Sequence, residues 1–161
     1  MTTNKPYGPG KRIRLDRRLY MSANRVYFFT IRAYKNQAPF TDDALSRRAI
    51  DLLRDQSLAS ACRVFSYCLM PDHLHLLASP ERNGVSVLEF VDRYKGRSTN
   101  ESWTLGWAGK LWEPRCYDHI VRADEDLLAL SRYILDNPLR KGLASAAERW
   151  PWSGLMNPLP V

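Results

Sequence analysis

The chain has 161 residues, of which 45% are hydrophobic and 25% are charged, and its formal net charge at pH 7 is +7. This composition is ordinary for a soluble globular protein of one domain. No apolar run is long enough for a transmembrane helix and the N-terminal residues are polar, so we expect neither membrane association nor a secretory signal. The three cysteines show no paired spacing, which fits a reducing, cytoplasmic compartment.

Nearly all of the net positive charge lies in residues 1–25, which contain seven basic residues and one acidic residue. Proline and glycine precede the basic run, so we predict an extended N-terminal arm, a folded domain over 26–142 and a C-terminal tail over 143–161. Basic arms commonly contact the phosphates of nucleic acids. A solubilising tail would have the same composition, so this alternative stays open.

The first half of the folded domain has the pattern of a strand, a helix and a hairpin. Residues 26–33 are rich in β-branched and aromatic residues, which predicts a strand. Apolar residues recur at helical spacing over 42–55, and Thr41 is a plausible N-cap for this helix. Residues 62–69 and 73–79 are predicted to form two strands that are joined by a tight connection.

The next segments have the pattern of a helix, a loop and a strand. Residues 85–97 carry apolar residues at helical spacing and predict a second helix. Residues 98–110 are predicted to be a loop. Residues 111–122 are predicted to be a fourth strand, and Pro114 within them argues for an edge position or a late start.

A third helix is predicted over 124–137, with Asp124 as its cap. Pro138 ends it, because the residue before a proline avoids the helical region. The predicted order is therefore β-α-β-β-α-β-α. This is an α+β, ferredoxin-like βαββαβ pattern with an antiparallel sheet and an additional C-terminal helix. We expect strand 73–79 to be central and the third helix to cover the face of the sheet that the first two helices leave free.

Two of the three histidines, His73 and His75, lie one residue apart in the central predicted strand. Side chains alternate between the two faces of a strand, so both imidazoles point one way while Leu74, Leu76 and Ala78 point into a core. Two imidazoles on one firm element can hold a metal ion. A half-exposed polar row is the alternative interpretation of the same pattern.

Tyr133 lies away from the leucine-rich stripe of the third predicted helix, and Asn137 follows four residues later on the same face. A phenol and an amide therefore share a face that is not the main hydrophobic one. A surface tyrosine or a second packing face would produce the same pattern.

Several of these segments resemble a known family. Residues 70–77 (MPDHLHLL) resemble the His-hydrophobe-His (HUH) strand of single-tyrosine transposases. Residues 111–122 (LWEPRCYDHIVR), 124–127 (DEDL) and 133–143 (YILDNPLRKGL) resemble one branch of them, the REP-associated tyrosine transposases, bacterial proteins linked to repetitive extragenic palindromes. The histidine motif is short, but its combination with the Tyr-Ile-x-x-Asn-Pro segment is specific. The likeness runs from about Arg12 to Gly154.

The resemblance implies a ferredoxin-like domain that nicks and joins DNA. His73 and His75 match the metal-binding pair, Asn137 matches the polar residue that completes the site, and Tyr133 matches the nucleophile. The implied cofactor is a divalent ion, Mg²⁺ or Mn²⁺, which would polarise a phosphodiester. Attack by Tyr133 would leave a 5′-phosphotyrosine and a free 3′-hydroxyl, so that the strand can be rejoined elsewhere.

The implied partners are single-stranded DNA hairpins resembling REP palindromes, bound by a monomer or a homodimer in the bacterial cytoplasm, in association with the nucleoid. The arginines expected to contact this DNA are Arg12, Arg14, Arg17 and Arg18.

Two alternatives remain open. Tyr117 shares a predicted strand face with His119 and is the second candidate nucleophile. The protein could also be a non-catalytic or domesticated module that binds hairpin DNA. A metalloprotease is disfavoured, because two histidines on a strand are not the helical HExxH motif.

Overall fold

The protein is described here by a computed structural model that covers residues 15–146 and 148–160. Within these residues, five strands form one antiparallel sheet in the order β4-β1-β3-β2-β5. The strands are β1 (Tyr27–Arg32), β2 (Cys62–Met70), β3 (His73–Pro80), β4 (Tyr117–Ile120) and β5 (Ser153–Leu155). The helices are α1 (Asp43–Ala59), α2 (Val87–Thr104), α3 (Leu127–Leu135) and α4 (Asn137–Arg140).

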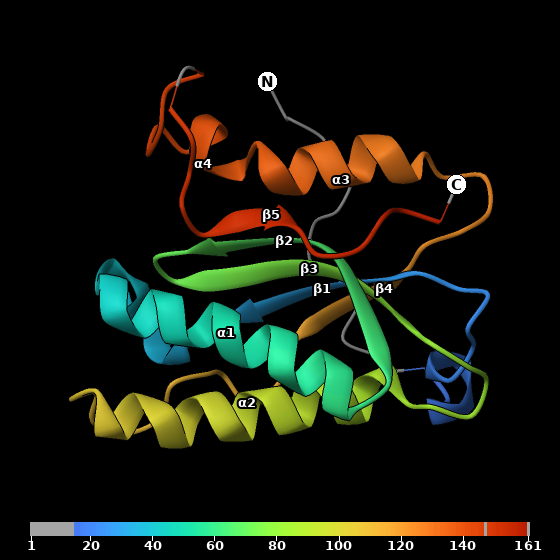
Figure 1. Cartoon of the computed structure of the whole chain (residues 1–161), viewed down its shortest axis with the longest axis horizontal. Coiled ribbons are helices and arrows are strands. Elements are labelled where there is room, and N and C mark those ends of the chain that lie inside the picture. The colour runs from blue at the N-terminus through green and yellow to red at the C-terminus, as the bar shows by residue number, and fades with distance from the viewer. Residues whose placement is uncertain (1–14, 147, 161) are drawn as a thin grey trace.

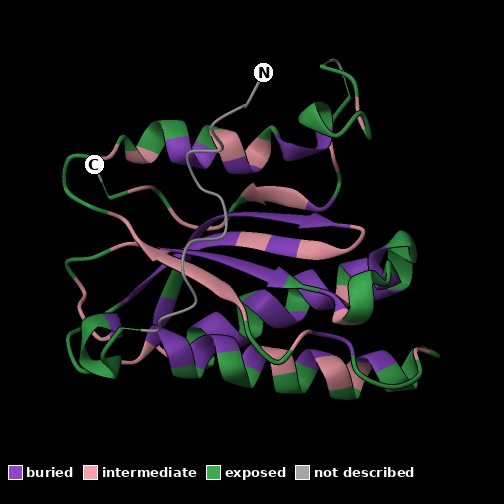
Figure 2. Cartoon of the chain, turned by 180° about the vertical axis from the view of Figure 1, so that it is seen from behind, coloured by how far each residue is buried: buried purple, intermediate pink, exposed green. Residues whose placement is uncertain are grey.

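The sheet lies between helices α1 and α2 on one side and helix α3 on the other (Figure 1). A hydrophobic core fills the space on each side of the sheet. Helices α1 and α2 pack on one face, where Leu74 and Leu76 of β3 are fully buried. Helix α3 packs on the other face, where Leu130 and Ile134 contact the smaller core beneath it. Figure 2 shows that burial is concentrated in the strands and in the helix faces turned toward them. The predicted α+β fold, the central position of β3 and the covering third helix are confirmed.

Helix α2 is longer than predicted, because residues 98–104 continue the helix where a loop was expected. The helical spacing of apolar residues does not extend into residues 98–104, because two buried positions of this part of the helix are the serines Ser98 and Ser102. Their hydroxyl groups donate to carbonyl oxygens in the preceding turn, at 2.7 Å for Ser98 to Tyr94 and 2.6 Å for Ser102 to Thr99. Hydrogen bonding within the helix satisfies these polar groups, so the helix continues without an apolar stripe.

Two predicted helix N-caps are wrong. Asp42, and not Thr41, caps α1, since its carboxylate accepts from the backbone N–H of Leu45 at 3.0 Å. Asp126, and not Asp124, caps α3 through the N–H of Ala129. Consecutive acidic or hydroxyl residues are all suitable caps, and the packing of the helix selects among them.

The predicted fourth strand is interrupted. Trp112 forms an isolated bridge with Ala33, and β4 begins only at Tyr117, after Pro114. Strand β4 is an edge strand that pairs with β1, as the proline indicated.

The two terminal segments also differ from expectation. Residues 153–155 of the predicted tail form β5, which covers the edge of β2. The predicted arm is not extended at Arg17–Tyr20, which form the 3-10 helix η1 and bury Tyr20 in the larger core. The Tyr20 hydroxyl donates to Asp118 of β4 at 2.6 Å. Among the described residues, every helix is too short or too polar to span a lipid bilayer.

Candidate metal and tyrosine site

The centre of the site is the histidine pair at the start of β3. His73 and His75 are partly buried and alternate with fully buried leucines, so both rings lie on the α3 face of the sheet. Their Nε2 atoms are 3.1 Å apart. The imidazoles therefore meet at one point beneath the helical layer formed by α3 and α4.

Asn137 joins the histidines from the first position of α4. Its side chain is buried, and its Nδ2 lies 3.1 Å from Nε2 of His73. A half-turn of the amide about its last bond would exchange the nitrogen and the oxygen and bring Oδ1 to the histidines. The fold thus places three residues from two distant segments of the chain in direct contact.

Each histidine is held at Nδ1 by a neighbouring oxygen atom. Nδ1 of His73 lies 2.6 Å from Oδ1 of Asp72, and Nδ1 of His75 lies 2.9 Å from Oγ1 of Thr30. When Nδ1–H donates to these oxygens, the Nε2 lone pair of each ring is directed at the common point. Phe28 stacks on His75, with ring centroids 5.5 Å apart, and limits the rotation of that ring.

The surroundings favour neutral imidazoles. Burial lowers the pKa of His73, against the opposing effect of Asp72. Burial lowers the pKa of His75 well below its usual range, and His73 and the cations Arg140, Arg32 and Lys141 act in the same direction. Both rings therefore keep a lone pair for a cation at neutral pH.

These residues fit a divalent metal ion. Two ligand atoms at right angles, each about 2.1 Å from one octahedral ion, are about 3.0 Å apart. The Nε2 atoms of His73 and His75 have nearly this separation. Among residues 15–146 and 148–160, no three His, Cys, Asp or Glu side chains are grouped to hold a metal. The amide of Asn137, beside His73, is a polar group that could add an oxygen donor to the two imidazoles. Imidazole and oxygen donors suit Mn²⁺ at least as well as Mg²⁺.

Tyr133 is tied to this cluster through Arg140. The guanidinium carbon of Arg140 lies 3.8 Å from the centroid of the Tyr133 ring, and Nη2 of Arg140 donates to Oδ1 of Asn137 at 3.3 Å.

The prediction that Tyr133 and Asn137 share a face of one helix is corrected. Asp136 has a non-helical ψ of 1°, so the residues belong to α3 and α4. Pro138 has no N–H with which to continue the first helix.

Tyr117, the alternative nucleophile, is half-buried on β4. It lies opposite Thr30, which in turn lies opposite His75, so all three share the α3 face of the sheet. Burial raises the pKa of its phenol, and the charges of Asp118 and Glu125 do so further.

His119, on the same strand as Tyr117, is held by a carboxylate. Its Nε2 lies 2.8 Å from Glu125 Oε1.

The predicted DNA-binding arginines divide into two pairs. Arg12 and Arg14 lie outside the described residues. Arg17 and Arg18 are exposed on η1, where Arg18 pairs with Asp16 at 3.0 Å.

Sequence reasoning missed three neighbours of the site: Thr30, Asp72 and Arg140. Asp72 and Arg140 lie within the quoted motifs, next to His73 and three residues after Asn137. Thr30 has no signal in the sequence, because its contact with His75 depends on the pairing register of β1 and β3.

Thr30→Val should weaken metal binding by about 10- to 100-fold, the usual effect of removing a partner that orients a histidine ligand. Valine retains the shape of threonine and suits a strand, so the fold should persist. Titration with Mn²⁺ would measure the change. Thr104→Val serves as the control. It removes a hydroxyl that donates to the backbone carbonyl oxygen of Glu101 at the C-terminal end of α2. Equal affinity in the two variants would contradict a role for Thr30.

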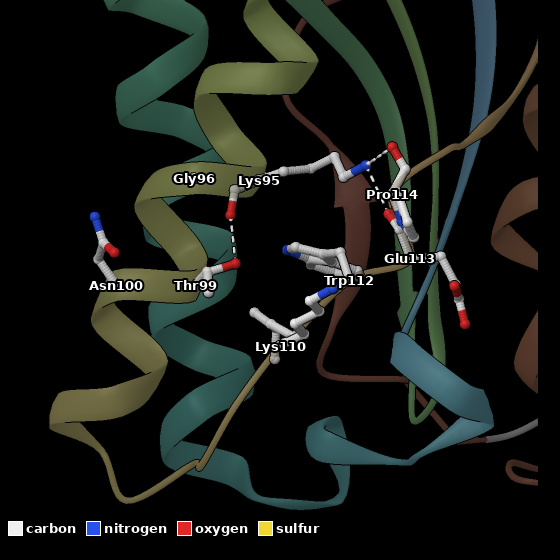
Figure 3. Close-up of a pocket in the computed structure, with 9 residues that line it drawn as sticks. Lys95, Gly96, Thr99, Asn100, Lys110, Trp112, Glu113 and Pro114 are labelled. Carbon is white, nitrogen blue, oxygen red and sulfur yellow. Dashed lines mark hydrogen bonds between the residues drawn. The ribbon is translucent and has the colours of Figure 1, made fainter.

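An open groove of about 300 Å³ lies on the other face of the sheet, between α2 and residues 110–114 (Figure 3). The ammonium group of Lys95 crosses it and donates to the carbonyl oxygens of Glu113 and Pro114, at 2.8 and 3.3 Å. Trp112 lines the groove and donates its indole N–H to Ser98 at 2.8 Å. The groove therefore belongs to the α1 and α2 layer and is separate from the histidine cluster.

The chain matches one protein-family model and is similar to known transposases. Residues 22–137 match the family model described as "Transposase IS200 like". The chain is similar to the REP-associated tyrosine transposase of Escherichia coli K12, with 26% identity over 85% of this chain and 79% of the relative. It is also similar to the ISDra2 transposase TnpA of Deinococcus radiodurans, with 29% identity over 52% of this chain and 64% of the relative.

The fold has a close structural counterpart. The structure of a REP-associated tyrosine transposase bound to a REP hairpin superposes with a TM-score of 0.71 at 19% identity. The superposition covers 88% of this chain and 82% of the other. At this identity the likeness concerns the fold. The match to the family model spans β1 to the start of α4 and so includes the histidines, Tyr133 and Asn137.

Proposed function

The chain belongs to the IS200-like transposase family, and from that premise we propose that it cleaves and rejoins single-stranded DNA through a covalent link to Tyr133. One observation carries the proposal: the Nε2 atoms of His73 and His75 and the amide of Asn137 converge at one point. Tyr133 is joined to this cluster by Arg140. Such a group of neutral nitrogen and oxygen donors beside a phenol suits phosphodiester chemistry.

The metal ligands in this proposal are His73, His75 and Asn137, and the ion is Mg²⁺ or Mn²⁺. When bound, the ion polarises a phosphate oxygen and offsets its negative charge. The protein supplies neutral imidazoles, since burial keeps their pKa values low, and it orients them through Asp72 and Thr30.

Tyr133 supplies the nucleophile. Its phenol oxygen forms a bond to phosphorus while the bond from phosphorus to the 3′-oxygen breaks. The phenol loses its proton and the departing 3′-oxygen gains one, leaving a 5′-phosphotyrosine and a 3′-hydroxyl. The energy of the phosphodiester is retained in the new ester, so a second 3′-hydroxyl can reverse the step and join a different strand.

The proposed substrate is hairpin-forming single-stranded DNA. A protein with the same fold was solved bound to a REP hairpin. The positive charges of Arg32, Arg140 and Lys141 all act on His75, so the histidine cluster lies in a field that attracts phosphate. Basic residues before β1 would add contacts to backbone phosphates; they include the predicted Arg12, Arg14, Arg17 and Arg18.

Covalent trapping tests this proposal. The protein is incubated with a pool of end-labelled hairpin DNAs that carry varied single-stranded flanks, in Mn²⁺ or in EDTA, and is then run on a denaturing gel. We expect a labelled band at the mass of a protein–DNA adduct in Mn²⁺, and its loss in EDTA. Retarded complexes on a native gel without any adduct would contradict cleavage and support the alternative, a module that binds hairpins without cutting them.

A further inference from the structure

The relation between Tyr133 and Asn137 is not set by one helix. Asp136 interrupts the helical backbone between them, with φ −85° and ψ 1°, and α4 restarts at Asn137. In a continuous helix, residues four apart are neighbours through the backbone alone. A side-chain contact across the break would add to the backbone in holding the phenol and the amide in a constant arrangement.

Arg140 makes this contact. It lies on α4 and reaches back across the break to α3, where its guanidinium carbon is 3.8 Å from the centroid of the Tyr133 ring. The same guanidinium donates from Nη2 to Oδ1 of Asn137 at 3.3 Å. Arginine can do both at once, because its planar group presents a face to an aromatic ring and N–H donors at its edge.

The contact with Asn137 continues to the histidines. Nδ2 of Asn137 is 3.1 Å from Nε2 of His73, which is 3.1 Å from Nε2 of His75. A continuous series of contacts therefore runs from the phenol ring to both imidazoles, and Arg140 is its link across the helix break.

We propose that Arg140 is a positioning residue that holds the ring of Tyr133 and the amide of Asn137 in one arrangement across the break between α3 and α4. The inference rests on the proposed function, in which Tyr133 attacks and Asn137 contributes a ligand. Arg140 acts through these two residues: it sets where the phenol lies relative to the metal ligands. Its loss should slow the chemical step more than it weakens the binding of DNA.

The test compares Arg140→Gln, Arg140→Lys and the control Arg132→Gln in single-turnover adduct formation. Arg132 is exposed on α3, one residue before Tyr133, so its replacement removes the same charge next to the nucleophile. For Arg140→Gln we expect an adduct rate at saturating hairpin DNA about 100-fold below wild type, with the half-saturating DNA concentration changed less than about 3-fold.

Arg140→Lys keeps the charge but not the planar group, so its rate should lie between those of wild type and Arg140→Gln. Equal rates in Arg140→Gln and Arg132→Gln would overturn the proposal. So would a normal rate at saturating DNA together with weaker DNA binding, which would make Arg140 a phosphate contact.

If Arg140→Gln does not fold, as judged by its thermal unfolding, Arg140→Lys decides: a rate at least 10-fold below wild type supports the proposal and a wild-type rate overturns it. Absence of an adduct in the wild-type protein would instead contradict the proposed function.

Discussion

Tyr133→Phe is expected to abolish the covalent protein–DNA adduct, with a loss on the order of 10⁴-fold or more, the scale at which removing a covalent nucleophile acts. Phenylalanine retains the ring that Arg140 covers, so α3 should keep its place on the sheet. Only the oxygen that would attack phosphorus is removed. The measurement is the yield of labelled adduct on a denaturing gel at saturating hairpin DNA and Mn²⁺.

Tyr117→Phe is the matched control for this change. Tyr117 is half-buried on the same face of the sheet as His75 and also carries a phenol. We expect its adduct yield to stay within about 3-fold of wild type. An adduct that persists in Tyr133→Phe and disappears in Tyr117→Phe would identify Tyr117 as the nucleophile. Unchanged hairpin affinity in both variants would show that the loss concerns chemistry and not binding.

His75→Ala is expected to reduce adduct formation by about 10³-fold, because a metal ion that polarises a phosphate contributes several kcal/mol to the transition state. The effect should be large at this position, since the ring of His75 is fixed by both Thr30 and Phe28. Titration of free Mn²⁺, followed by its electron paramagnetic resonance signal, should show that the variant no longer binds the ion.

His119→Gln controls for the loss of a histidine. His119 lies on β4 and is held by the carboxylate of Glu125, away from the Nε2 atoms that converge on β3. Its Mn²⁺ affinity should equal that of wild type. If His75→Ala retained wild-type Mn²⁺ affinity, the metal site at His73 and His75 would be refuted. If His119→Gln lost as much Mn²⁺ affinity as His75→Ala, the proposal that Mn²⁺ binds specifically at His73 and His75 would be refuted.

The local sequence pattern was sufficient to predict the order of the helices and strands and the strand that carries the two histidines. Strand side chains alternate between faces, so His73 and His75 must share one side of β3 wherever that strand lies in the fold. Leu74 and Leu76 alternate with the histidines and required a core on the other side of the sheet, and the structure buries both leucines there. The central place of β3 and the helix over the histidines followed from the element order.

Local pattern failed where polar residues occupied buried positions or where pairing came from distant segments. Serines at the buried positions of α2 concealed the last part of that helix. Strand β5 is only three residues long and exists because the edge of β2 supplies hydrogen-bond partners for it. Short strands of this kind have little intrinsic preference, and their formation depends on the neighbouring strand.

The amino-acid pattern alone was enough to predict the fold class, the shared face of His73 and His75, and the presence of Tyr133 and Asn137 on the segment that covers them. How these residues meet depends on the packing of distant segments against one another. The register of β1 against β3 brings Thr30 to His75, and the break at Asp136 makes Arg140 the link between Tyr133 and Asn137. Periodicity along a chain reports which residues share a face. Contacts across strands and across a helix break depend on packing between segments that are far apart in sequence.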